Sequence, residues 1–121
     1  MKMIMLVDDD PAILNLLTRL FRREKLPVIT AYSAPSAMDL LGMINVDLII
    51  LDIMMLGADG IELCHELRQN SVTSGTPIIM LSAREDLVTQ QDAFDAGANM
   101  FVGKSYGCNN LINTALQLLA S

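Results

Sequence analysis

The chain has 121 residues, of which 52% are hydrophobic, and its 14 acidic and 8 basic residues give a formal net charge of −6. These values predict one folded domain over residues 1–121 and argue against a disordered chain. The negative charge argues against direct binding to nucleic-acid phosphates, and no uncharged apolar run approaches the roughly 18 residues of a membrane span. The opening "MKMIMLV" is too short for a signal peptide, so we expect a cytoplasmic protein.

Apolar strand patterns and helical patterns alternate along the chain. The first strand is expected at residues 2–7, and a helix begins at Pro11 because Asp10 is a suitable N-cap and proline loses no hydrogen bond at the first helical position. Further strands are expected at 27–32, 46–51, 76–82 and 99–103. Further helices are expected at 36–44, stopping near Gly42, at 61–69, at 86–97 with Gly97 after the last turn, and at 109–120.

These five strand–helix units predict an α/β fold, a doubly wound parallel sheet with right-handed crossovers and helices on both faces. Burial on both faces explains why the strands are nearly continuous runs of valine, isoleucine, leucine and methionine. Sites in such sheets lie beyond the carboxyl ends of the strands, where the strand order switches.

Polar residues stand at those strand ends. They are Asp8 and Asp9 after the first strand, Asp52 after the third, Ser82 at the end of the fourth and Lys104 just past the fifth. Taken singly, each could be a turn, capping or surface residue. Asp52 is the hardest to explain in that way, because the apolar run continues behind it through residues 53–56. A carboxylate in such surroundings is costly unless it is paired or titrates.

Three carboxylates, a hydroxyl and an ammonium group at one edge suit phosphoryl transfer to an aspartate. Mg²⁺ is usually held by one or two carboxylates with several waters, so Asp9 and Asp52 would bind it directly and Asp8 through water. Asp52 would then attack a phosphoryl group. Lys104 and Ser82, with nearby backbone N–H groups, would neutralise the phosphoryl oxygens. The two cysteines and the single histidine lack zinc-site spacing.

The segments "MLVDDDP", "LIILDIMMLGADGIEL", "PIIMLSA" and "GANMFVGK" resemble the receiver domain of two-component response regulators, over essentially the whole chain. The resemblance implies a flavodoxin-like five-stranded fold with strand order 2-1-3-4-5. It also implies that Asp52 accepts a phosphoryl group from a histidine kinase or a histidine phosphotransfer protein, and that the domain catalyses only its own phosphorylation and dephosphorylation.

The resemblance assigns a role to each matching position. Asp8 and Asp9 match the acidic pair that, with Asp52 and the backbone carbonyl of Met54, binds Mg²⁺ or Mn²⁺. Ser82 and Lys104 match the phosphate-contacting residues. Ser82 and Phe101 match the switch pair, although composition alone would make Phe101 a core residue.

Two positions depart from the family pattern. Leu56 stands where a proline is usual in the loop after the acceptor, and Ser105 stands where a proline usually follows the lysine in a cis bond. A cis bond before serine costs about 3–4 kcal/mol. We therefore predict a trans Lys104–Ser105 bond, with compensating backbone changes near Gly103 and Gly107.

Two other interpretations remain open from the sequence. "VDDDPA" approaches the signature of haloacid-dehalogenase phosphatases, with Asp8 as nucleophile and Asp10 as general acid/base, but Ala12 stands where threonine or valine is needed and Asp52 is left unexplained. A receiver-like docking module that is not phosphorylated would be expected to lack an acid or the lysine, and neither is missing. His65 is interpreted as a surface residue of a helix.

Output is expected through the fourth helix, fifth strand and fifth helix. Residues 105–121 carry no charge, and the outer face of the last helix has only Asn, Gln and Thr, which leaves a weak homodimer open. The charged residues that pair receivers of winged-helix transcription factors are lacking, so that dimer is not predicted. The end at "LLAS" leaves room for an output domain beyond Ser121.

Overall fold

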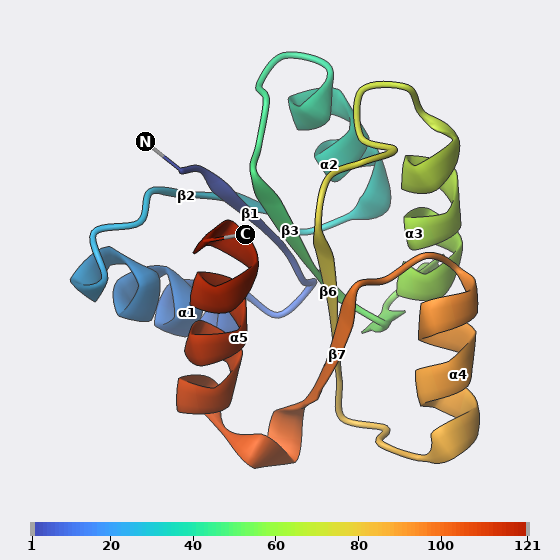
Figure 1. Cartoon of the computed structure of the whole chain (residues 1–121). Helices are drawn as coiled ribbons and strands as arrows, with labels where there is room; N and C mark the ends of the chain where they lie inside the picture. Colours follow the sequence, from blue (N-terminus) through green and yellow to red (C-terminus); the bar gives the residue numbers. More distant parts are fainter. Residues whose placement is uncertain (1, 121) are drawn as a thin grey trace.

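The computed structural model describes residues 2–120 as a five-stranded parallel sheet with helices on both faces (Figure 1). The sheet strands are β1 (Ile4–Val7), β2 (Val28–Ala31), β3 (Leu48–Asp52), β6 (Ile78–Ser82) and β7 (Met100–Gly103). The helices are α1 (Pro11–Arg23), α2 (Ala34–Leu41), α3 (Gly60–Gln69), α4 (Leu87–Asp95) and α5 (Cys108–Ala120). The strand order is β2-β1-β3-β6-β7, which confirms the predicted order 2-1-3-4-5 of the five main strands.

The sheet separates two hydrophobic cores. Helices α1 and α5 cover one face, and α2, α3 and α4 cover the other (Figure 1). Because successive strand side chains point to opposite faces, Met5 and Val7 of β1 enter the core under α2 to α4, whereas Ile4 and Leu6 enter the core under α1 and α5. The central strands are therefore buried on both faces, as their apolar sequences predicted.

Four helices, α1 to α4, begin at short polar side chains that accept backbone N–H groups, as N-caps do. Asp10 caps α1, with its Oδ1 2.9 Å from the amide of Ala12, and Pro11 follows at the first helical position as predicted. Ser33, Asp59 and Asp86 cap α2, α3 and α4 in the same way. After α4, Gly97 has a φ of +109°, the left-handed conformation expected of a residue following a helix.

Three short elements were not predicted. Strands β4 (Met54–Met55) and β5 (Ala58–Asp59) form a two-stranded antiparallel hairpin directly after β3, and Gly57 turns between them with a φ of +71°. The 3₁₀ helix η1 (Lys104–Tyr106) joins β7 to α5. Elements of two or three residues are too short to produce a hydrophobic period, so the sequence pattern could not show them.

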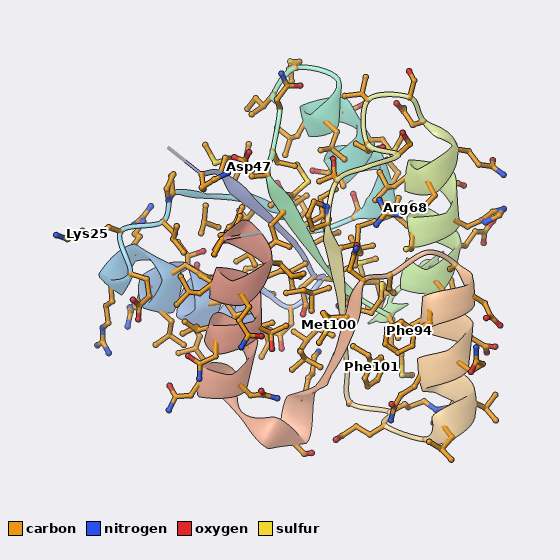
Figure 2. The ribbon with its side chains drawn as sticks, viewed as in Figure 1. Lys25, Asp47, Arg68, Phe94, Met100 and Phe101 are labelled. Atoms are coloured by element: carbon orange, nitrogen blue, oxygen red, sulfur yellow. The ribbon has the colours of Figure 1, made fainter. Side chains whose placement is uncertain are left out.

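Arg68, at the C-terminal end of α3, binds the loops that precede β6 and β7 (Figure 2). Its guanidinium donates hydrogen bonds of 2.6–3.3 Å to five acceptors: the carbonyls of Thr73, Ser74, Thr76 and Gly97 and the side-chain Oδ1 of Asn99. These contacts lie at the end of the sheet where β6 and β7 begin, opposite the strand ends that carry the candidate site.

Two smaller expectations concern the surface. His65 is exposed on α3, with its Nε2 3.1 Å from the side-chain amide of Gln69, as expected of a surface helical residue. Within residues 2–120, the helices are all too short or too polar to span a bilayer.

Candidate functional site

The polar residues predicted at the strand ends do come together. Asp8 follows β1, Asp52 ends β3 and Lys104 follows β7, so parallel pairing of the strands brings the three side chains to one edge. The Lys104 ammonium lies 3.4 Å from Asp52 Oδ2 and 3.6 Å from Asp8 Oδ2. Asp8 and Asp52 are only 3% and 4% exposed. Lys104 is thus a positive charge shared by two buried carboxylates.

Asp9 completes an acidic cluster with these two residues. Asp8, Asp9 and Asp52 each offer a carboxylate oxygen, and the three oxygens lie within 4.8 Å of one another. Asp9 Oδ2 accepts the backbone N–H of Leu56 at 2.6 Å. Asp8 Oδ1 accepts the N–H of Asp10 at 3.0 Å, but Asp8 Oδ2 is buried with no hydrogen-bond partner among the described residues.

This donor set fits a hard divalent cation. Mg²⁺ and Ca²⁺ prefer carboxylate oxygens, and a buried oxygen without a hydrogen bond in a folded protein calls for an explanation such as an ion. The cluster Asp8, Asp9 and Asp52 therefore suits divalent-metal binding, both because its donors are carboxylates and because one buried oxygen makes no hydrogen bond.

The charge on Asp52 is disfavoured by its surroundings. The pKa of Asp52 is raised from 3.8 to about 6, chiefly because the carboxyl group is buried and secondly because the Asp8 carboxylate lies nearby. Lys104 and the N–H of Met54, 3.3 Å from Asp52 Oδ1, act in the opposite direction. Any additional positive charge at the site would therefore stabilise the ionised form of Asp52.

The chain directly after Asp52 packs against Gly60, a residue whose role the sequence did not reveal. A Cβ at Gly60 would overlap the Asp52 carbonyl oxygen and lie 2.7 Å from Ile53 Cα, and the Gly60 N–H donates to Ile53 O at 2.8 Å. Only glycine allows α3 to begin this close to the end of β3. The signal was the Asp-Gly pair ahead of the third helix, where Asp59 is the N-cap.

Ser82 and Phe101 lie on the two neighbouring strands. Ser82 is fully buried at the end of β6, and its Oγ accepts the N–H of Arg84 at 3.0 Å. Phe101 is half-buried, packs against the core under α2 to α4, and lies between β7 and α4 (Figure 2). Their positions are compatible with a switch pair, whose movement stays a prediction.

The loop after Lys104 follows the trans prediction in part. Residues 2–120 contain no cis peptide bond, so the Lys104–Ser105 bond is trans. Gly107 has a φ of +85°, which confirms a special conformation there, but Gly103 has ordinary extended angles of −76° and 140°. The compensating change expected at Gly103 is absent because the chain turns later, in η1, and reaches the left-handed region only at Gly107.

The sequence pattern of the response regulator receiver domain matches residues 4–116. The chain belongs to this family. A curated relative, the heme response regulator HssR of Staphylococcus aureus, is 37% identical over 108 residues, which are 89% of this chain and 47% of the relative. The receiver domain thus spans about half the length of the curated relatives that it matches.

Solved structures of other receiver domains share the fold. A putative response regulator from Chloroflexus aurantiacus is 30% identical with a TM-score of 0.93, covering 99% of this chain and 98% of its own. The response regulator TrrA of Thermotoga maritima, solved with Mg²⁺ and BeF, is 32% identical with a TM-score of 0.86, covering 98% of this chain and 99% of its own.

The chain is therefore a receiver domain of a two-component response regulator. Neither the phosphatase nor the docking-module interpretation is favoured, because the match to the receiver family spans residues 4–116. Receiver domains are in general signalling domains that interact with histidine kinases and output domains, not enzymes acting on other substrates.

Proposed function

We propose that Asp52 is the phosphoacceptor of this receiver domain. The observation that supports this assignment is the position of its buried carboxylate, 3.4 Å from the Lys104 ammonium and within the cluster of Asp8 and Asp9. The Asp52 carboxyl group has a raised pKa and lies next to a cation and to other carboxylates that could bind a metal ion. A carboxylate nucleophile for phosphoryl transfer needs this arrangement.

Asp8, Asp9, Asp52 and the backbone carbonyl of Met54 would hold the metal ion, Mg²⁺ or Mn²⁺. When bound, the ion supplies positive charge that offsets the three carboxylates and the incoming phosphoryl oxygens. Asp8 Oδ2 supports this assignment, because it is buried without a hydrogen bond and only the Lys104 ammonium, at 3.6 Å, offsets its charge.

The remaining chemistry belongs to the side chains. A carboxylate oxygen of Asp52 forms a bond to phosphorus as the P–N bond of a phosphohistidine breaks, and the imidazole nitrogen leaves with the electron pair. Lys104 binds one phosphoryl oxygen, and the Ser82 hydroxyl, after releasing the N–H of Arg84, binds another. Movement of Ser82 leaves space beside β7 that Phe101 fills, which alters the surface of α4, β7 and α5.

The partners follow from these roles. A histidine kinase or histidine phosphotransfer protein in the cytoplasm supplies the phosphoryl group, and an output domain or partner protein binds the α4, β7 and α5 surface. This surface has exposed apolar side chains, namely Leu87, Val88, Met100 and Leu116, and α5 carries no charge. These features also suit a weak homodimer. We expect the domain to catalyse only its own phosphorylation and dephosphorylation.

Incubation with Mg²⁺ and acetyl phosphate, followed by mass spectrometry, tests the assignment of Asp52. We expect a gain of one phosphoryl group that maps to the peptide containing Asp52 and is lost in Asp52→Asn. Asp39→Asn, an exposed aspartate on α2, is the matched control and should be phosphorylated normally. Phosphorylation that persisted in Asp52→Asn and mapped to Asp8 would contradict the proposal and favour the phosphatase interpretation.

A further inference from the structure

A hydrogen bond joins η1, the turn that contains Lys104, to the β6–α4 loop. The Ser105 hydroxyl donates to Glu85 Oε1 at 2.8 Å, and the two residues are 20 positions apart in the sequence. Glu85 belongs to the β6–α4 loop, which follows Ser82 at the end of β6 and also carries Arg84, while Ser105 lies in η1. The bond therefore connects the loop of the switch hydroxyl to the loop of the site lysine.

Gly103 provides the space for this bond. A Cβ at Gly103 would overlap the Glu85 carboxylate and lie 2.6 Å from Glu85 Cγ. The backbone angles of Gly103, −76° and 140°, are open to any residue, so glycine is needed here for space and not for conformation. The Glu85 side chain thus lies across the end of β7, directly before Lys104.

Lys104 needs support of this kind. Its side chain is a flexible chain of four carbons, and its ammonium lies 3.4 Å from Asp52 Oδ2 and 3.6 Å from Asp8 Oδ2. The turn that carries it is a single 3₁₀ turn, closed by a long bond of 3.5 Å from the Gly107 N–H to the Lys104 carbonyl. Serine at position 105 also lacks the fixed φ with which proline stiffens a turn.

We propose that Glu85 and Ser105 are positioning residues for Lys104 in the phosphorylation reaction. Their bond holds η1 against the β6–α4 loop, so that the ammonium stays over Asp52 without a proline after the lysine. The inference rests on the proposed function. It adds Glu85 and Ser105 to the residues that the reaction needs, although neither is assigned to bind the metal ion or the phosphoryl group.

The first test measures the rate of phosphorylation by acetyl phosphate with saturating Mg²⁺. Ser105→Ala and Glu85→Ala should each lower the rate roughly threefold to tenfold, because a misplaced charged group loses part of its effect on the transferring phosphoryl group. Ser105→Thr, which keeps the hydroxyl, and Glu85→Gln, which keeps an acceptor oxygen, should restore most of the rate. Glu66→Ala, an exposed glutamate on α3, is the control.

Gly103→Ala breaks the same bond without changing either partner. Its methyl group displaces the end of a flexible side chain, so the domain should fold and lose a similar part of its rate. In the Glu85→Ala background the methyl group has no carboxylate to displace, and Gly103→Ala should cause little further loss.

Two further readouts separate positioning from general stability. In a Lys104→Ala background, Ser105→Ala should leave the remaining rate unchanged, whereas a structural defect would lower it again. The NMR resonance of the Lys104 ammonium reports its contact with the carboxylates without any phosphodonor, and it should move in Ser105→Ala and Glu85→Ala toward its position in Asp52→Ala.

The outcomes are distinguishable. A shifted ammonium resonance with a lower rate supports the proposal. A shifted resonance in a chain that is not phosphorylated at Asp52 supports the positioning contact and overturns the proposed function. An unmoved resonance and an unchanged rate in a chain that is phosphorylated overturn the proposal, and so does an equal loss of rate in the Lys104→Ala background.

Discussion

Asp52 carries its charge at a cost to the folded domain. An acid whose pKa is raised on folding keeps its proton in the folded state at pH values where the unfolded chain has lost it. Its ionisation therefore lowers stability as the pH rises from about 4 to about 6, the interval between its ordinary and folded pKa values. Above about pH 6 the loss is complete and constant.

This cost predicts that Asp52→Asn stabilises the metal-free domain at neutral pH. We expect a gain of about 1–2 kcal/mol at pH 7, which shrinks as the pH falls through 6 toward 4. Urea unfolding at several pH values measures it. Asp39→Asn corrects for the removal of one negative charge from the molecule. A stability difference that did not change between pH 4 and pH 7 would contradict the raised pKa.

A divalent cation should relieve the same cost. A cation that binds the folded site and not the unfolded chain stabilises by mass action, so millimolar Mg²⁺ should raise the Tm by several degrees above a NaCl control of equal ionic strength. Asp9→Asn removes one of the three clustered carboxylates and should abolish most of the increase. An equal increase in Asp9→Asn would place the ion elsewhere.

At the scale of elements, the close approach of α3 to β3 makes Gly60 essential. Gly60→Ala should destabilise the domain by about 2–4 kcal/mol, because the added methyl group overlaps backbone atoms of Asp52 and Ile53, which cannot move as a side chain could. Chemical unfolding measures the loss. Gly75→Ala is the control, since a Cβ there has no heavy atom within 4 Å. Similar losses in the two variants would show that the overlap is relieved cheaply.

The elements also show how far a sequence can be interpreted. The five main strands and five helices were predictable because each has enough residues for a hydrophobic period, and Asp8, Asp9, Asp52 and Lys104 were predictable because parallel strands end at one edge. The close approach at Gly60 and the proposed role of Glu85 were missed, because both depend on the space between separate segments of the chain. Periodicity contains no information about such space.

At the scale of the whole molecule, one end of the sheet contains the hydrogen bonds of Arg68 and the other contains the candidate site. Arg68 binds five acceptors at the end where β6 and β7 begin, and the candidate site occupies the end where they stop. Arg68→Ala should lower the free energy of unfolding by about 2–4 kcal/mol, because several partly buried carbonyl groups lose a charged donor.

The rate of phosphorylation should remain close to that of the unaltered chain in Arg68→Ala, measured well below its Tm. Arg68→Lys should also lose stability, since an ammonium group cannot reach five acceptors. The exposed Arg23→Ala, in the last turn of α1, controls for the loss of a positive charge. A rate that fell in proportion to stability would show that the two ends are coupled.

The Leu56 amide should report whether a metal ion binds at the candidate site. Its hydrogen bond to Asp9 Oδ2, at 2.6 Å, is short and charge-assisted, although the Leu56 side chain is 92% exposed. Such a proton should resonate far downfield and exchange slowly with solvent for a residue at a loop tip. A cation that binds the Asp9 carboxylate should weaken this hydrogen bond, so the Leu56 amide resonance should shift during a titration with Mg²⁺. A proline at this position has no N–H, so a receiver with the usual residue there has no such reporter.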